Sequence, residues 1–118
     1  MEFKGISWLG VKTAKFIELC NFYENLLNLP TAHSEPGFRA YNLPNGDRIE
    51  VFADNDESHK HFSTGPVVGF LVDNIETTRV EMEAAGIEFL SPIKGKAGKS
   101  RWSHFRGPDG NVYEITER

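Results

Sequence analysis

The sequence predicts one α+β domain in which two tandem βαβββ modules form a curled mixed sheet around a cleft. The first observation is that "LPNGDRIEVF" (43–52) is repeated as "GPDGNVYEIT" (107–116), 64 positions later. The second is that the openings "WLGV" (8–11) and "VVGF" (67–70) match at an offset of 59. The third is that helical apolar spacing follows each opening. A repeat near 60 residues is longer than a solenoid unit, so it indicates two copies of a larger module.

Module one covers about residues 5–53. It opens with an apolar, β-leaning strand at 6–13, and the helix expected over 13–29 begins after Thr13, a plausible cap. The apolar positions with helical spacing are Phe16, Leu19, Cys20, Tyr23, Leu26 and Leu27. Residues 30–37 have turn composition. "FRAYNL" and "DRIEVF" follow as two strands, joined by the strong hairpin signal "PNG".

Residues 54–64 are polar and are expected to link the two modules. The "HKH" at 59–61 could suggest metal binding, but we expect solvated imidazoles there because nothing in the sequence fixes them. Module two covers about residues 65–118, so the whole chain, 1–118, is a single domain.

The second module repeats the order of the first. Its strand at 66–73 precedes a helix over 74–87, with Asn74 or Asp73 as the N-cap and Gly86 as the stop. The spacing predicts Val80 and Ala84 on the inward side of this helix. Strands then follow in "IEFLSPI", "SRWSHF" and "NVYEIT", the last two joined by "GPDG".

Charge and composition exclude several classes of partner. Thirteen basic and seventeen acidic residues give a net charge of −4 without a basic patch, so we expect no nucleic-acid binding. No apolar run approaches the roughly 20 residues of a membrane span, and the N-terminus lacks a signal-peptide pattern. We therefore expect a cytoplasmic protein without a membrane partner. The single cysteine, Cys20, is expected to be a small buried thiol.

Strand alternation divides the apolar and acidic residues between two faces. The sets expected to face the helices are Leu9/Val11, Ile49/Val51, Val68/Phe70 and Tyr113/Ile115. The opposite face collects Trp8, Gly10, Glu50, Phe52, Val67, Gly69 and Glu114, and by parity Trp102 and His104 can join it. A face that combines indole and phenyl rings with two carboxylates at equivalent repeat positions favours a ligand-binding cleft. Two carboxylates that meet in a half-dry cleft would share a proton and could act as acid and base.

These motifs resemble the vicinal-oxygen-chelate superfamily, which includes glyoxalases, bleomycin-resistance proteins, fosfomycin-resistance enzymes and extradiol dioxygenases. The resemblance covers nearly the whole chain. Its strongest part is "FRGPDGNVYEI" (105–115), which looks like the signature F-x-D-P-D-G-N-x-x-E, with Gly107 in place of the first aspartate. The other matching pieces are "WLGVKTAKFIELCNFYENLLNL", "GDRIEVF" and "VVGFLVDNIETTRVEMEAAGIEF".

The resemblance implies paired β-α-β-β-β modules, a homodimer, and a metal in the cleft. The four metal-ligand positions of the family fall here on Trp8, Glu50, Val67 and Glu114. Tryptophan and valine have no lone pair suited to a divalent cation. Glu50 and Glu114 are therefore the metal ligands only if a metal is bound, with His104 as a third candidate.

Two functions follow from these residues. The first is a small glyoxalase/bleomycin-resistance-like protein that binds a small planar or aromatic ligand without an intact metal site. Its ligand-binding residues would be Trp8, Phe52, Val67, Trp102 and His104, with no cofactor expected. The alternative is a metal-dependent lyase, isomerase or dioxygenase in which a divalent metal is held by Glu50 and Glu114, the candidate catalytic residues.

Overall fold

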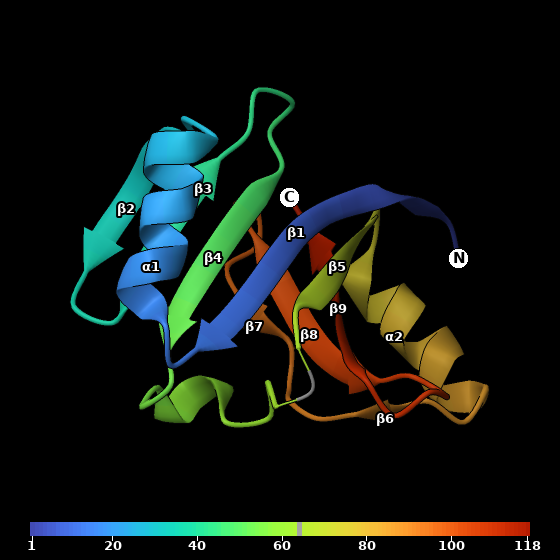
Figure 1. Cartoon of the computed structure of the whole chain (residues 1–118). Coiled ribbons are helices and arrows are strands. Elements are labelled where there is room, and N and C mark those ends of the chain that lie inside the picture. The colour runs from blue at the N-terminus through green and yellow to red at the C-terminus, as the bar shows by residue number, and fades with distance from the viewer. Residues whose placement is uncertain (64) are drawn as a thin grey trace. The chain divides into compact units, whose positions relative to one another are not determined.

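The computed structural model describes residues 1–63 and 65–118, in two compact units (Figure 1). Unit A is Trp8–Pro66, and unit B combines Met1–Ser7 with Val67–Arg118. Residue 64, at the end of the expected linker, lies outside the described residues. Within those residues no helix is long and apolar enough to cross a membrane.

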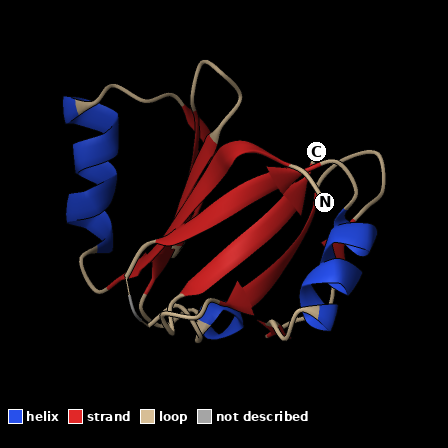
Figure 2. Ribbon diagram, turned by 90° about the vertical axis from the view of Figure 1, so that its right-hand side faces the viewer, coloured by secondary structure: helices blue, strands red, loops and turns tan. Residues whose placement is uncertain are grey.

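Strands make up most of the regular structure (Figure 2). The strands are β1 (Phe3–Thr13), β2 (Thr31–Glu35), β3 (Phe38–Asn42), β4 (Arg48–Ala53), β5 (Val67–Val72), β6 (Glu88–Phe89), β7 (Lys94–Gly95), β8 (Arg101–Arg106) and β9 (Val112–Glu117). The helices are α1 (Phe16–Asn21), α2 (Ile75–Ala84), the π-helix η1 (Phe22–Leu26) and the 3-10 turn η2 (Glu57–His59). The predicted α+β class is confirmed.

Both units use the same strand order. In unit A the later part of β1 pairs parallel with β4, and β4, β3 and β2 continue as antiparallel neighbours. In unit B β5 pairs parallel with β9, β9 pairs antiparallel with β8, and β8 pairs with β6 and β7. The register repeats as well, because Gly10 lies opposite Glu50 and Gly69 lies opposite Glu114. The internal repeat in the sequence therefore corresponds to a repeat in strand pairing.

The first helical segment departs from the expected continuous helix over 13–29. The α-helix ends at Asn21 and continues as a π-helix, in which the Leu27 N–H donates to the Phe22 carbonyl five residues back. Such a wide turn rotates the following side chains away from their α-helical direction. Leu26 and Leu27 are consequently 68% and 47% exposed instead of packed inward. The positive φ of Asn28 follows the end of this segment.

The expected turn at 30–37 is also wrong in part, since Thr31–Glu35 forms the edge strand β2. Every residue of β2 is exposed. An exposed edge strand has no buried face and so lacks the alternating apolar residues that would identify it in a sequence. The prediction for residues 30–37 therefore rested on their turn-forming composition alone. The predicted hairpin turn is confirmed, with Gly46 at φ +89°.

The core of unit A lies under α1 and η1. Its buried residues are Cys20, Tyr23, Tyr41 and Val51, and Ile49 packs against them. Ile49 and Val51 therefore face the helix as predicted. Glu50 and Phe52 consequently lie on the opposite face, which α1 and η1 do not cover and which is called the helix-free face below. In unit B the corresponding core contains Val72, Ile75, Met82, Phe105 and Ile115, with Phe70 and Tyr113 at its edge.

Helix α2 is shorter than predicted and presents a different side. Asn74 is confirmed as the N-cap, because its side-chain oxygen accepts the Thr77 N–H at 2.9 Å. Val80 and Ala84 are exposed, Val80 to 66%, so their predicted inward direction is wrong. The buried stripe is instead Ile75, Thr78 and Met82. Ile75, in the first turn of α2, is 0% exposed, so the helix packs on the side that carries Ile75. The apolar Val80 lies on the other side.

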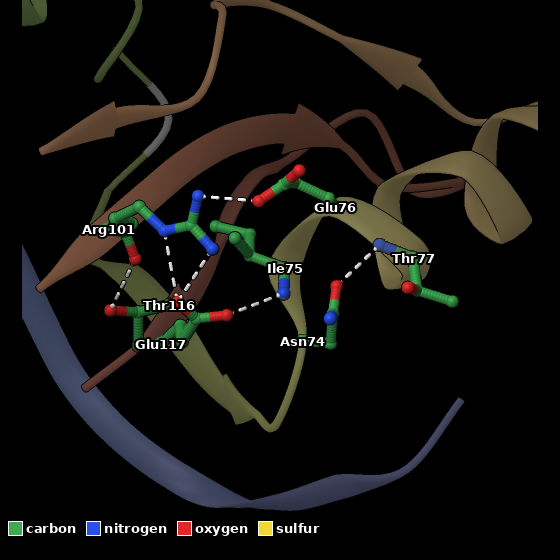
Figure 3. Close-up of polar contacts among 7 residues, drawn as sticks. All are labelled: Asn74, Ile75, Glu76, Thr77, Arg101, Thr116 and Glu117. Carbon is green, nitrogen blue, oxygen red and sulfur yellow. Dashed lines mark hydrogen bonds and ion pairs between the residues drawn. The ribbon is translucent and has the colours of Figure 1, made fainter. Parts of the chain in front are cut away.

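An ionic network ties the start of α2 to the last strand (Figure 3). One carboxylate oxygen of Glu117 accepts the Ile75 N–H at 3.0 Å, and the other accepts from Arg101 Nε and Nη2 at 3.0 and 2.8 Å. Arg101 also donates to Glu76 at 2.6 Å. The hydrogen bond from the Ile75 amide is the main cause that lowers the pKa of Glu117 below its ordinary value of 4.5. Arg101 lowers the pKa as well, and burial opposes both.

We expect Glu117→Gln to lower the free energy of unfolding by about 1 kcal/mol at pH 7, because a charge-assisted bond at a partly exposed site is replaced by a neutral one. The stabilisation by ionised Glu117 is present above the unfolded pKa of 4.5 and is lost as pH falls through the lower folded value. The difference between wild type and variant should therefore shrink toward pH 3. Urea unfolding followed by circular dichroism measures it. Glu76→Gln, at a 65% exposed partner of the same arginine, is the control, and an equal pH dependence in both variants would contradict the assignment.

Candidate functional site

The two repeated glutamates lie in different environments. Glu50 is on β4, its side chain is 19% exposed, and it accepts a hydrogen bond from Arg48 Nε at 2.7 Å. Glu114 is on β9, its side chain is 4% exposed, and its Oε2 lies 3.0 Å from His104 Nε2. Each carboxylate therefore has a charged or titratable neighbour from its own unit.

The contact between His104 and Glu114 follows from the pairing of β8 with β9, where the two residues are directly opposite. The 3.0 Å distance between His104 Nε2 and Glu114 Oε2 is that of an ion pair when the ring is protonated. A carboxylate that is only 4% exposed needs such a neighbour, because burying an unpaired charge raises the free energy of the folded state. The predicted shared face of His104 and Glu114 is confirmed, and the pair can chemically accept, hold or release a proton.

Trp8 folds back over its own strand. A Cβ atom built on Gly10 would lie 2.0 Å from the Trp8 ring atom Cη2. The indole therefore lies against the backbone of Gly10 on the helix-free face of unit A, and the absence of a side chain at residue 10 makes room for it. Trp8 is half-buried.

Phe52 lies at the centre of an aromatic cluster in unit A. The His59 ring stacks on it with the centroids 3.9 Å apart, Phe38 lies at 5.2 Å, and Phe62 meets it edge-on at 6.0 Å. Trp8 reaches the same cluster through Phe62, at 6.1 Å. Phe52 and Phe62 are only 3% and 5% exposed, so they form a buried aromatic cluster, and the half-buried Trp8 lies at its border.

The expectation of solvated imidazoles at 59–61 is wrong for His59. Besides stacking on Phe52, its Nδ1 lies 3.1 Å from Asp56 Oδ1. Burial alone would raise the pKa of Asp56, but hydrogen bonds from Ser58 and His59 lower it overall. Sequence reasoning missed His59 and Phe62. The only signal was their spacing of three within a polar segment, which suits one turn of helix.

Val67 and Trp102 belong to unit B. Val67 begins β5 and is 1% exposed. Trp102 is half-buried on β8, and a Cβ on Gly95 would lie 2.8 Å from its ring. Trp102 is two residues from His104 on the same strand, so the two side chains share a face.

The residues at the four metal-ligand positions do not fit a tight metal centre. Trp8 and Val67 offer no donor, while Glu50 is engaged by Arg48 and Glu114 lies against His104. Across residues 1–63 and 65–118, no group of three or more His, Cys, Asp or Glu side chains is placed to hold a metal ion. Two of the four positions that the resemblance assigns to metal ligands therefore carry no donor atom.

Solved structures share this fold at low sequence identity. Methylmalonyl-CoA epimerase from Mycobacterium tuberculosis is 19% identical, with a TM-score of 0.72, over 98% of this chain and 88% of that one. The Mn(II)-bound glyoxalase from Novosphingobium aromaticivorans is 16% identical, with a TM-score of 0.76, over 98% of this chain and 39% of the longer enzyme. A glyoxalase/bleomycin resistance protein/dioxygenase superfamily member from Vibrio splendidus 12B01 is 15% identical, with a TM-score of 0.65, over 99% and 100%.

The comparison with curated proteins finds no significant match. The model of one protein family, however, matches residues 5–115, which include both repeats and the "GPDGNVYEI" motif. With the repeated strand pairing and the resemblance in sequence, this match shows that the chain belongs to the Glyoxalase/Bleomycin resistance protein/Dioxygenase superfamily.

Proposed function

We propose that the protein binds a small planar or aromatic molecule on the helix-free face of unit A, without an intact metal centre. Trp8 would stack on the ligand, the buried Phe52 ring would support Trp8 from within the aromatic cluster, and Glu50 would orient the polar or cationic part of the ligand. The observation that supports the proposal is the half-buried Trp8 indole, which lies against Gly10 beside the aromatic cluster and keeps part of its ring surface open to a flat molecule.

The chemistry of the metal-ligand positions supports the same proposal. Where the family places ligating side chains, this chain has an indole at Trp8 and an isopropyl group at Val67. Neither side chain has a donor atom for a metal, and of the two only the half-buried Trp8 offers apolar surface for stacking, since Val67 is 1% exposed. Trp102 and His104 belong to unit B, and their predicted role in ligand binding stays a prediction.

Intrinsic fluorescence tests the proposal in a Trp102→Phe background, in which Trp8 is the remaining tryptophan. We expect N-methylquinolinium to quench the emission saturably, with micromolar affinity. Phe52→Ala should weaken binding roughly twofold to tenfold, because the cluster that supports the Trp8 indole loses its central ring and one aromatic contact contributes about 0.5–1.5 kcal/mol. Gly10→Ala should also weaken it, because the new Cβ displaces the indole.

Val80→Ala is the control, since it truncates a 66% exposed apolar side chain on α2, in unit B. Loss of quenching in that variant, or no saturable quenching by any planar aromatic probe, would contradict the proposal. The alternative enzyme, a metal-dependent lyase, isomerase or dioxygenase, is tested by metal analysis of the purified protein. Stoichiometric Mn, Fe, Ni or Zn would overturn the metal-free proposal in its favour.

We also propose that the protein is a homodimer, as its family resemblance implies. The exposed apolar side chains of α1 and η1, which are Ile17, Phe22, Leu26 and Leu27, support an assembled state. Sedimentation equilibrium that gives a monomer mass at micromolar concentration would exclude it.

A further inference from the structure

Unit B contains a pocket that the proposed function does not use. It has a volume of about 370 Å³ and is lined by Phe70, Phe105, Gly107, Pro108, Asp109 and Tyr113. Phe70, Phe105 and Tyr113 belong to the core beside α2, so the pocket opens on the helix side of the strands. Glu114 and His104 point to the other face. The pocket is therefore separate from every residue assigned above to ligand binding.

Its wall is a stack of three aromatic rings. Tyr113 lies between Phe70 and Phe105, with centroid distances of 6.0 and 5.7 Å and interplanar angles of 25° and 22°. Tyr113 and Phe70 are only half-buried, so part of the stack borders the pocket. Phe3 also contacts Phe70, with the ring centroids 5.3 Å apart, so a further flat group would meet the half-buried rings where they border the pocket.

Gly107 makes room for this stack. A Cβ at residue 107 would lie 2.6 Å from Tyr113 Cε2 and 2.8 Å from Asp109 Oδ1. At the equivalent positions of unit A, 64 residues earlier, the chain has Leu43 and Ile49. The pocket therefore depends on a combination that the first repeat lacks, a residue without a side chain beside a tyrosine.

The charged residue of the pocket is an oriented carboxylate. Asp109 Oδ2 accepts the Tyr113 hydroxyl at 2.7 Å and the Asn111 side-chain amide at 3.0 Å, and Oδ1 accepts the Asn111 backbone N–H at 3.2 Å. The Tyr113 hydroxyl is the main cause that lowers the pKa of Asp109. None of the lining residues is basic. The nearby Arg106 donates instead to the Gly110 carbonyl at 2.8 Å.

We propose that this pocket is a second small-molecule site, which takes an aromatic ammonium ion. The aromatic ring of the ligand would pack against the open sides of the Tyr113 and Phe70 rings that border the pocket, and its ammonium group would lie beside Asp109. A neutral aromatic molecule would gain the stacking but not the charge contact, and an aromatic anion would be repelled. The combination of aromatic faces with one carboxylate is the chemistry that recognises such cations.

The experiment is a titration of ¹⁵N-labelled full-length protein with phenyltrimethylammonium, followed by NMR. We expect saturable shifts of the Gly107 and Gly110 amides and of the Tyr113 ring. Asp109→Asn keeps an oxygen acceptor for Tyr113 and should weaken binding roughly threefold to tenfold. Gly107→Ala should also weaken it, because the displaced Tyr113 ring disrupts the stack.

Asp47→Asn is the matched control, because it makes the same change of charge in the other hairpin turn, and its affinity should equal that of wild type. The neutral near-isostere 2-phenyl-2-propanol should bind at least threefold more weakly than the cation. Equal affinity for the two probes, no saturable shift, or shifts confined to Trp8 and Phe52 would overturn the inference. The fluorescence test of the helix-free face reads a different site, so either proposal can fail alone.

Discussion

Replacing Glu114 with alanine is expected to lower the free energy of unfolding by about 3–5 kcal/mol, the usual cost of removing one partner from a buried charged pair. The side chain is 4% exposed, and its loss leaves the His104 ring, 2% exposed, without the carboxylate 3.0 Å away. Chemical denaturation at pH 7, followed by circular dichroism, measures the change. Glu114→Gln keeps the shape of the side chain and should cost less, about 1–3 kcal/mol.

The repeat provides the control for this prediction. Glu50→Ala removes the equivalent glutamate from unit A, where Arg48 is partly exposed and can be solvated, so the loss should stay within about 1 kcal/mol. The double variant His104→Ala/Glu114→Ala should cost less than the sum of the two single variants, because the contact is lost only once. Equal losses for Glu114→Ala and Glu50→Ala, or strict additivity in the double variant, would show that the pair is not energetically coupled.

A loss of about 3–5 kcal/mol is also expected for Tyr41→Ala, since a large aromatic side chain leaves a fully buried position. Tyr41 is 0% exposed, and it packs with Cys20, Tyr23 and Val51 beneath the first helix. Its hydroxyl also donates to Glu24 Oε1 at 2.8 Å. The cavity, and not the hydrogen bond, should account for most of the effect.

Tyr41→Phe separates the two contributions. It retains the ring and removes the hydroxyl, and Glu24 keeps its bond from Arg39, so the expected loss is about 1 kcal/mol. Guanidinium unfolding of the three proteins gives the comparison. A phenylalanine variant as unstable as the alanine variant would mean that the hydroxyl network holds the core together.

Burial also raises the pKa of Tyr41, and its bonded neighbours Cys20 and Glu24 raise it further. The folded state therefore resists ionisation of this phenol, whereas the unfolded chain ionises near its ordinary value of 10.0. Stability provided by the neutral hydroxyl is present below that pH and falls as pH rises above it. Tyr41→Phe should accordingly show a smaller alkaline loss than wild type.

Most of the architecture could be predicted because the repeat carries redundant information. Two turns, two apolar strands and two glutamates at matched offsets predicted two like modules, and the strand pairing repeats in both, with Gly10 opposite Glu50 and Gly69 opposite Glu114. The faces of Ile49, Val51, Phe70 and Tyr113 followed from simple alternation. The predicted side-chain directions were therefore right in strands that alternate apolar and polar residues and that have an equivalent strand in the other module.

The failures have local physical causes. The π-helical turn after Asn21 changes the direction of Leu26 and Leu27, and no α-helical periodicity can signal such a turn. His59 depends on a stacking partner in a strand, Phe52, which only the folded chain brings near. The pocket beside Tyr113 depends on Gly107, whose departure from the family motif was visible in the sequence but whose role needed the ring positions.

The close approach of Gly107 to Tyr113 has an evolutionary consequence. With only 2.6 Å between a Cβ at residue 107 and the tyrosine ring, the two positions cannot vary independently. Homologues that have an aspartate or another side chain at the glycine position should carry a smaller or differently oriented residue at the tyrosine position. An alignment of close homologues should therefore show covariation between these two columns.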